Sequence, residues 1–213
     1  MKTLLASTLL CALSYALFGQ KTINVDSLQR IQQIAEETFA DGILLYHDGK
    51  IIHEWYNSDC DSTYLNTASA VKSWTGLLIG RLLKEGKIKS LEDPVCDYLP
   101  DWEAGCEADV RLKHLLTMSA GINKRRSRTG PRRNMMVEPD FNAFALDMPL
   151  DTMPGIRFSY SNETVQLLAP IIERTCGLSV EKCFREKLFE PLGMDSTSLA
   201  KDEAGNAVVF GGA

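Results

Sequence analysis

Apolar positions near the start of the chain recur at the spacing of an α-helix. They form one stripe made of Leu28, Ile31, Ile34 and Ala35. Residues three and four apart lie on one face of a helix, so this stripe predicts an amphipathic helix. Asp26, with Gln29 three residues later, has the pattern of a capping box and is the expected N-cap.

The next stretch predicts a β-hairpin followed by a longer helix. Residues 42–46 and 51–56 have the pattern of strands, and Asp48-Gly49 between them is typical of a tight hairpin turn. From Ser69 to Lys84 the spacing is again helical, and Gly86 is suited to end the helix in the left-handed conformation. Its apolar positions, which include the Trp74 and Leu77 stripe that we expect in the core, are Val71, Trp74, Leu77, Leu78 and Leu82.

The rest of the chain is expected to be mostly helical. The expected helices are a short one over 112–118, one over 163–175 that is kinked or begins at Pro170, and a last one from a cap at Ser179 through Leu188. The first of these should stop at Ala120-Gly121, and residues 123–156 have the pattern of a long loop with broken helix. Strands followed mostly by helices predict an α+β fold.

Length and charge limit the class of protein. The chain has 213 residues, 45% of them hydrophobic, which is enough for one domain with a core and leaves little room for two. The net charge is -5, which gives no overall attraction to nucleic acid or to an anionic membrane surface. Nucleic acid is therefore not an expected partner.

The first residues have the pattern of a signal peptide. Lys2 supplies a positive start, and residues 3–18 are an uncharged, mostly apolar run that is short for a membrane span. We expect residues 1–19 to be a signal peptide and residues 20–213 to be the mature domain, exported to the periplasm or the cell exterior. No stable membrane insertion is expected after cleavage; the alternative is a retained anchor.

Export would place the remaining cysteines in an oxidising compartment, where disulfides are permitted. They are Cys60, Cys96, Cys106, Cys176 and Cys183, an odd number, so at least one stays free or pairs between chains. Cys96 with Cys106 and Cys176 with Cys183 are the short-range candidates. The other interpretation is that most are small buried apolar residues. No pair has zinc-ligand spacing with a histidine, so no metal is expected.

A Ser-x-x-Lys sequence stands where the helix over 69–84 begins. Ser69 and Lys72 are three residues apart, so they lie one turn apart on one face and the Lys72 amine reaches the Ser69 hydroxyl. A serine hydroxyl is a poor nucleophile until a base lies within hydrogen-bond reach. A second match, Ser179 with Lys182, begins a helix that needs a hydroxyl only as a cap, and a simple cap is also the alternative for Ser69.

A Tyr-x-Asn sequence supplies two more candidates. Tyr160 and Asn162 follow the turn pattern Pro154-Gly155 and precede a helix, which places the Tyr160 phenol on a loop able to line a cleft. A phenol can carry a proton between nucleophile and leaving group, and the Asn162 amide can hold a substrate amide. The alternative is a buried tyrosine with a satisfied hydroxyl. An earlier match, Tyr64-Leu65-Asn66, lies just beyond a strand and precedes Ser69.

Taken together, Ser69-x-x-Lys72 and Tyr160-x-Asn162 resemble the serine β-lactamase-like and penicillin-binding-protein superfamily in order and separation. Four further stretches match it as well: residues 83–100, 114–121, 154–162 and 189–194. The resemblance is to the branch containing class C β-lactamases, related esterases and 6-aminohexanoate-dimer hydrolases, and it covers about residues 40–213. It implies a β-lactamase/DD-peptidase-like fold.

The resemblance also implies a chemistry. The chain would be a serine hydrolase that forms an acyl-enzyme on Ser69 with an amide, ester or lactam and releases it with water. Lys72 and Tyr160 would handle the proton and Asn162 would bind the small-molecule or peptide-like acyl substrate, with no metal or organic cofactor. A basic loop of lysines and arginines over 124–133 is either a solvated surface or an attraction for a substrate carboxylate. His114 is expected beside the site or in the core.

The chain departs from the family in one respect. The family's third motif, Lys or His followed by Thr or Ser and Gly, should come well after Tyr160, and nothing after Asn162 matches it. We therefore expect an incomplete fold, with the helical region and N-terminal hairpin present and the C-terminal sheet strands missing. The alternative function is a catalytically inactive truncated relic, or a non-catalytic binding protein of the same fold. The DNA downstream of codon 213 would distinguish the two.

Overall fold

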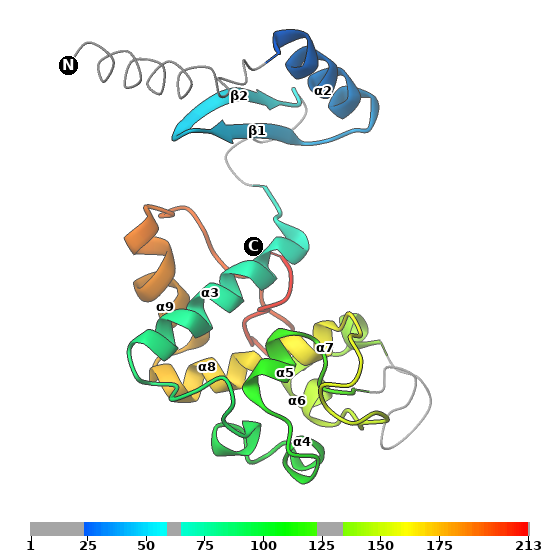
Figure 1. Ribbon diagram of the computed structural model, residues 1–213, viewed down its shortest axis with the longest axis vertical. Coiled ribbons are helices and arrows are strands. Elements are labelled where there is room, and N and C mark those ends of the chain that lie inside the picture. Colours follow the sequence, from blue (N-terminus) through cyan, green and yellow to red (C-terminus); the bar gives the residue numbers. More distant parts are fainter. Residues whose placement is uncertain (1–23, 59–64, 123–133, 213) are drawn as a thin grey trace, which may run out of the picture. The chain divides into compact units, whose positions relative to one another are not determined.

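The computed structural model describes residues 24–58, 65–122 and 134–212. The expectations for the signal peptide, Cys60, Tyr64 and the basic loop lie outside these residues. The chain divides into two compact units, residues 1–65 and residues 66–213, which we call the hairpin unit and the helical unit (Figure 1).

The hairpin unit contains one helix and a two-stranded antiparallel sheet. Helix α2 (Val25–Glu37) precedes strands β1 (Gly42–His47) and β2 (Lys50–Tyr56). The predicted hairpin is confirmed: Asp48 and Gly49 both have positive φ, 47° and 77°, as a type I′ turn requires. The predicted N-cap is wrong, because the side chain of Asn24, not that of Asp26, accepts the hydrogen bond from the Ser27 amide.

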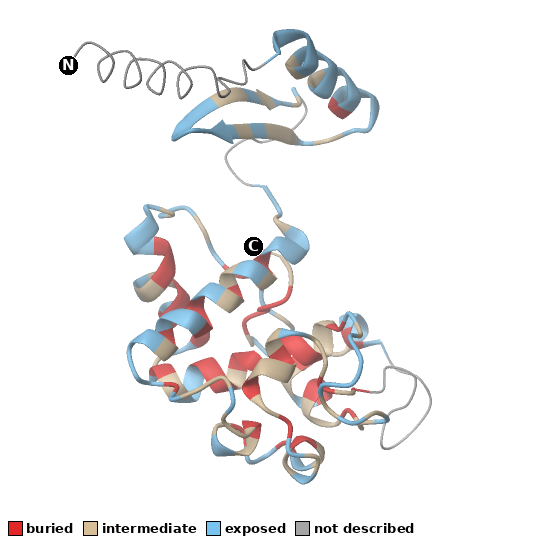
Figure 2. Cartoon of the chain, in the orientation of Figure 1, coloured by how far each residue is buried: buried red, intermediate tan, exposed pale blue. Residues whose placement is uncertain are grey.

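The first α-helix of the helical unit is α3 (Val71–Lys84), and several helices and a π-helical turn follow it (Figure 1). These are α4 (Glu103–Glu107), α5 (Leu112–Leu116), α6 (Phe141–Leu146), α7 (Asn162–Gln166), α8 (Leu168–Cys176) and α9 (Val180–Phe184), with a π-helical turn at Arg185–Phe189. Their buried faces share one apolar core (Figure 2). Among these elements, α3 contacts α8 and the π-helical turn. The two strands of the hairpin unit and the mainly helical remainder confirm the α+β prediction.

The buried face of α3 differs from the predicted stripe at one position. Leu77 is 58% exposed, so the expectation that it lies in the core is wrong. The inward positions are Val71, Thr75, Leu78, Ile79 and Leu82. Trp74 does pack on the core, with its ring edge-on to Phe189 at 5.5 Å between centroids. The polar Thr75 thus belongs to the core face, and Leu77 does not.

The predicted helix over 163–175 is broken, as expected. It consists of α7 and α8, which meet at Leu167, three residues before Pro170. Proline has no N–H, so Pro170 cannot donate the helical bond to the Gln166 carbonyl four residues earlier. Ser179 caps α9 by accepting the Lys182 amide, which confirms that prediction.

Four cysteines of the helical unit form disulfides. Cys96 bonds to Cys106, and Cys176 bonds to Cys183. The alternative that these cysteines are free apolar side chains is therefore wrong. The first bond ties a 3₁₀ turn to α4, and the second ties the end of α8 to α9.

Candidate active site

Ser69 lies in a 3₁₀ turn, Ala68–Ala70, that leads directly into α3. Ala68 has a φ of 45°, in the left-handed region that residues with a Cβ rarely adopt. Its amide donates to Asn66 Oδ1 at 2.8 Å, which holds this turn. The turn leaves the Ser69 side chain exposed at the amino end of α3.

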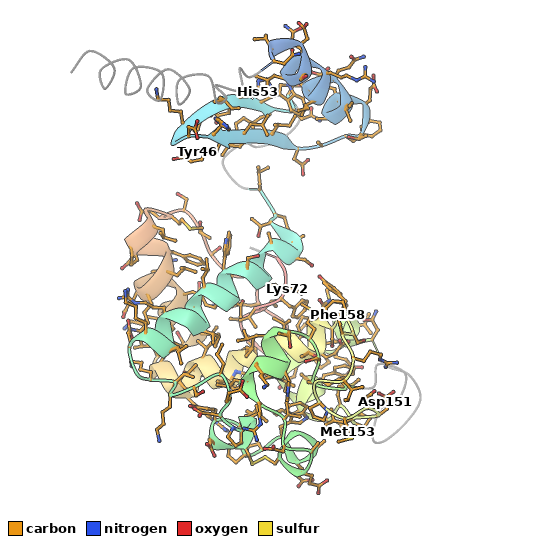
Figure 3. The ribbon with its side chains drawn as sticks, in the orientation of Figure 1. Tyr46, His53, Lys72, Asp151, Met153 and Phe158 are labelled. Carbon is orange, nitrogen blue, oxygen red and sulfur yellow. A yellow bond between two sulfur atoms is a disulfide. The ribbon has the colours of Figure 1, made fainter. Side chains whose placement is uncertain are left out.

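Lys72, labelled in Figure 3, lies in the first turn of α3, and its amine reaches the Ser69 hydroxyl. Its Nζ lies 3.0 Å from Ser69 Oγ and donates to the Phe210 carbonyl at 2.5 Å. The amine also lies 4.9 Å from the centre of the Tyr160 ring and 5.5 Å from that of Phe210, within range of cation–π attraction. These contacts fix the nitrogen beside Ser69.

Tyr160 completes the cluster. Its hydroxyl lies 2.8 Å from Ser69 Oγ, and the side chain is 48% exposed. The loop before it is bonded to the end of the α5 segment, because Gly155 donates to Ser119 O at 2.8 Å and Ser159 donates to Met118 O at 2.9 Å. Tyr160 therefore lies on a loop that the protein backbone holds in place.

Asn162, the first residue of α7, lines the same pocket as Ser69. The pocket has a volume of about 410 Å³, and its walls include Asn66, Met136, Phe141 and Phe210. Asn162 Oδ1 is buried and has no hydrogen-bond partner among the described residues. An unpaired buried acceptor costs free energy, so this oxygen is suited to receive an N–H of a bound molecule.

The structure thus brings Lys72 and Tyr160 into contact with Ser69, and Ser69 and Asn162 line one pocket. The serine of the second Ser-x-x-Lys match has a different role. Ser179 caps α9, and Lys182 pairs with Glu186 at 3.6 Å. The competing Tyr64 lies outside the described residues.

His114 lies beneath the loop that carries Tyr160 and not in the cluster. Its Nδ1 accepts the Arg111 amide at 3.1 Å, and its Nε2 is 3.2 Å from where a Cβ on Gly155 would stand. Burial lowers the pKa of His114 below its usual value, and the positive charges of Lys113 and Arg111 lower it further. A half-buried position beside the site agrees with the expectation for this residue.

Sequence reasoning missed the Phe210 carbonyl that accepts from Lys72, and the two side chains that hold the preceding residue Val209, which are Thr75 and Gln166. A backbone carbonyl has no residue type to reveal it. Thr75 does leave a trace in the sequence, since it is a polar residue on an otherwise apolar helix face, and Gln166 is a polar residue next to the apolar residues Val165 and Leu167. The sequence does not show, however, which residue these side chains would bond to.

In the part of the chain that the structure describes, no three His, Cys, Asp or Glu side chains are grouped so that they could hold a metal ion. None of the helices in residues 24–58, 65–122 and 134–212 combines the length and apolarity needed to cross a bilayer.

The profile of the Beta-lactamase family matches residues 29–210. The chain belongs to the beta-lactamase family. The chain is 28% identical over 199 residues to Protein flp of Staphylococcus aureus (strain MRSA252), a match that covers 83% of this chain.

Two solved structures show the same fold. A Bacteroides dorei protein assigned as a beta-lactamase superposes with a TM-score of 0.71 at 22% identity, covering 90% of this chain and 59% of that one. A Bacillus anthracis protein assigned as a 6-aminohexanoate-dimer hydrolase superposes with a TM-score of 0.70 at 19% identity, covering 85% and 52%. The predicted β-lactamase/DD-peptidase-like fold is confirmed.

The chain spans much less than the full length of these relatives. It covers 39% of Protein flp.

Proposed function

We propose that this protein is a serine hydrolase that forms an acyl-enzyme on Ser69 with an amide, ester or lactam substrate. The supporting observation is that Lys72 Nζ and the Tyr160 hydroxyl lie 3.0 and 2.8 Å from Ser69 Oγ. Membership of the family points to hydrolases of the serine β-lactamase type. A nucleophile with two proton carriers in direct contact is the arrangement that acyl transfer needs.

The proposed reaction has two stages. Ser69 Oγ attacks the substrate carbonyl carbon while its proton passes to Lys72 or Tyr160, whichever is then deprotonated. The Ser69 amide, at the amino end of α3, donates to the oxyanion that forms. The bond to the leaving group then breaks, and the leaving group takes a proton from Tyr160 or Lys72. Water next attacks the acyl-enzyme, releasing a carboxylic acid and returning the proton to Ser69.

Asn162 is proposed to orient the substrate. Its buried Oδ1 would accept an N–H next to the reacting carbonyl, which favours a small-molecule or peptide-like amide. The names of the relatives, a beta-lactamase and a 6-aminohexanoate-dimer hydrolase, fit a lactam or an amide. The pocket walls Met136, Phe141 and Phe210 would take the apolar part of the acyl group.

Export is part of the proposal. Two disulfides in the helical unit support a protein that matures outside the reducing cytoplasm, in the periplasm or beyond the cell. The pattern of a signal peptide over residues 1–19 supports the same route.

The test is covalent labelling of the purified gene product with a fluorophosphonate probe, followed by peptide mapping. We expect the label on Ser69. Ser69→Ala should abolish labelling, and should also abolish hydrolysis of p-nitrophenyl acetate, because loss of one member of such a unit typically costs several orders of magnitude. Ser179→Ala is the matched control, since it removes the other serine of the Ser-x-x-Lys type and should change neither rate.

Two outcomes would overturn the proposal. Labelling that persists in Ser69→Ala but is lost in Ser179→Ala would mean that the nucleophile is the other serine. A folded protein that is never labelled would favour the alternative, an inactive relic or a binding protein of the same fold.

A further inference from the structure

Two polar side chains lie wholly inside the apolar core of the helical unit. Thr75 on α3 and Gln166 at the end of α7 are both 0% exposed. Burying a hydroxyl or an amide is unfavourable unless it is hydrogen-bonded. Their partners therefore indicate what they do in the fold.

Gln166 pairs with the backbone of the segment over residues 207–210. Its Nε2 donates to the Ala207 carbonyl at 3.0 Å, and its Oε1 accepts the Val209 amide at 3.2 Å. The second N–H donates to Asn142 Oδ1 at 2.8 Å, on α6. The side-chain amide thus acts on residues 207–209 as a neighbouring strand would, and every hydrogen of its NH₂ group has an acceptor.

Thr75 donates a hydrogen bond to the carbonyl of Val209 in the same segment. Its hydroxyl lies 2.6 Å from Val209 O and 3.1 Å from Val71 O, and the shorter contact reaches across to the segment. Thr75 is one turn after Lys72 on α3, on the same helix face. The two residues meet consecutive carbonyls, Thr75 that of Val209 and Lys72 that of Phe210.

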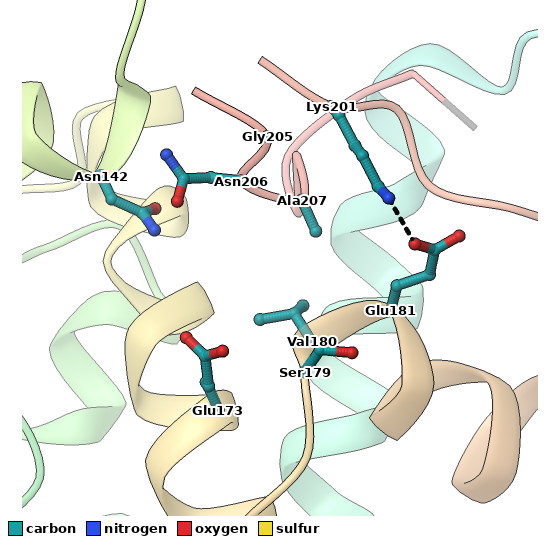
Figure 4. A pocket seen from close by; sticks show the side chains of 9 residues that line it. All are labelled: Asn142, Glu173, Ser179, Val180, Glu181, Lys201, Gly205, Asn206 and Ala207. Carbon is teal, nitrogen blue, oxygen red and sulfur yellow. Dashed lines mark ion pairs between the residues drawn. The ribbon is translucent and has the colours of Figure 1, made fainter. Parts of the chain in front are cut away.

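The start of this segment and the residues just before it have other contacts. Gly205, Asn206 and Ala207 line a second, polar pocket of about 150 Å³ (Figure 4). Lys201, which forms a β-bridge with Ala207, pairs with Glu181 of α9 at 2.9 Å (Figure 4). Residues before Ala207 therefore have anchors of their own, while Gln166 and Thr75, together with the hydrogen bond from the Val208 amide to Ala200 O at 2.8 Å, set the position of residues 207–209.

We propose that Gln166 and Thr75 are positioning residues for Lys72, an inference that rests on the proposed function of Ser69. They fix the segment over 207–210 so that the Phe210 carbonyl accepts a hydrogen bond from Lys72 and keeps the amine 3.0 Å from Ser69 Oγ. The lysine amine ends a flexible four-carbon chain, so its position depends on the acceptors around it. If Phe210 O were displaced, the Lys72 amine would keep Ser69 Oγ as an acceptor but would lose the second acceptor, which fixes the direction from which the amine approaches Ser69.

The consequence is a loss of reactivity at Ser69 without loss of any group that touches the substrate. Displacements of about 1 Å at a reacting group can cost on the order of 100-fold in rate. We expect Thr75→Val and Gln166→Met, which keep side-chain size and remove the hydrogen bonds, to slow fluorophosphonate labelling of Ser69 by roughly 10- to 100-fold. Thr75→Ser keeps the hydroxyl and should restore a rate within roughly threefold of the parent.

The matched control is Thr175→Val. Its hydroxyl donates to Ile171 O at 2.8 Å, within α8 itself, so this variant makes the same chemical change without reaching the segment. It should label at the parent rate. Circular dichroism shows whether each variant folds. If Gln166→Met does not fold, the labelling rate of Thr75→Val, which exchanges only a hydroxyl for a methyl group, tests the proposal.

A double-mutant cycle with Lys72→Ala separates positioning from general damage. If Thr75 and Gln166 act through Lys72, their substitutions will slow labelling in the parent and cause no further loss in the Lys72→Ala background. Equal fold losses in both backgrounds would overturn the proposal, as would unchanged labelling in both single variants. A folded parent that is never labelled would instead overturn the proposed function, and the positioning role with it.

Discussion

At Ser69 the hydroxyl oxygen is within hydrogen-bond reach of two donors, the Lys72 amine and the Tyr160 phenol. Either of them must lose its own proton before it can take the serine proton. We therefore expect Lys72→Ala and Tyr160→Phe each to slow fluorophosphonate labelling of Ser69 by roughly 100- to 10,000-fold, the range of general acid–base catalysis. Tyr160→Phe keeps the ring near Lys72, so it isolates the hydroxyl.

The matched control for this measurement is Tyr98→Phe. The Tyr98 hydroxyl donates to Asp93 Oδ2 at 2.5 Å, in a hydrogen bond that involves neither Ser69 nor Lys72. It should lower thermal stability and leave the labelling rate unchanged. Labelling rates that are unaffected by both Lys72→Ala and Tyr160→Phe would remove those residues from the mechanism.

His114 makes stability depend on pH. Its pKa in the folded protein lies below the usual 6.5 because of burial and the nearby Lys113 and Arg111, with Glu92 and Asp109 opposing them. The unfolded chain therefore binds more protons as pH falls below about 6.5, and the free energy of unfolding decreases there. We expect the urea midpoint to fall from pH 7.5 to pH 5, and the fall to be smaller in His114→Asn. Equal slopes in the two proteins would contradict this assignment.

Residue types and their spacing were sufficient to predict which side chains gather around Ser69 and its pocket. Ser69 and Lys72 are fixed by one helical turn, and Tyr160 and Asn162 by a loop that leads into a helix. The Phe210 carbonyl could not be predicted, because its approach to Lys72 depends on a contact 138 residues along the chain. Only the folded core shows that contact.

Among the secondary-structure elements, local signals predicted turns better than helix faces. Asp48-Gly49 sets the hairpin by its own backbone preference. The cap of α2 was misassigned because Asn24 and Asp26 are both good capping residues two positions apart. Leu77 was misplaced because apolar spacing alone gave no reason to prefer Thr75 for the core face, which its bond to Val209 explains. Helix α4 was not predicted.

Two glycines in different elements should respond oppositely to alanine. Gly121 has a φ of 85°, and a Cβ there would stand 2.1 Å from Thr152 O, so Gly121→Ala should destabilise by more than about 1 kcal/mol. Gly80 is exposed within α3 with open space around it, so Gly80→Ala should stabilise by about 0.5–1 kcal/mol. Urea unfolding midpoints measure both.

A stabilised Gly121→Ala and a destabilised Gly80→Ala would contradict the positive φ and close contact at Gly121 and the open space at Gly80. Gly121→Ala should also slow labelling of Ser69. Gly121 O accepts the Asp151 amide at 3.0 Å, which ties down the loop that continues to Tyr160. Gly80→Ala should leave labelling unchanged and serves as the control.

Across the whole molecule, the apolar core belongs to the helical unit (Figure 2). All members of the main buried cluster lie between Val71 and Phe210, whereas Ala35 is the buried apolar residue of the described hairpin unit. The resemblance to the family predicted the fold as a whole better than it predicted the individual helix ends, because motif order depends on the whole chain and helix ends depend on local competition between caps.

The disulfides test the molecule as a whole, because they link packing to the compartment in which the protein folds. Each closes a short loop, with separations of 10 and 7 residues, so the loss of either should cost about 2–3 kcal/mol and lower the melting temperature by about 5–10 °C. Cys176 and Cys183 are 5% and 0% exposed, so replacing both with alanine also leaves space in the core. We expect that pair to cost more than Cys96→Ala with Cys106→Ala.

The measurement is thermal unfolding of the two double variants and the parent, with and without dithiothreitol, together with non-reducing peptide mapping. Reductant should lower the melting temperature of the parent more than that of either variant, because each variant has already lost one bond. It should open Cys96–Cys106 first, since both of its cysteines are only partly buried. If a maleimide reagent labelled all four cysteines in the unfolded protein without reductant, the disulfides would be absent, and the support they give to export would be lost with them.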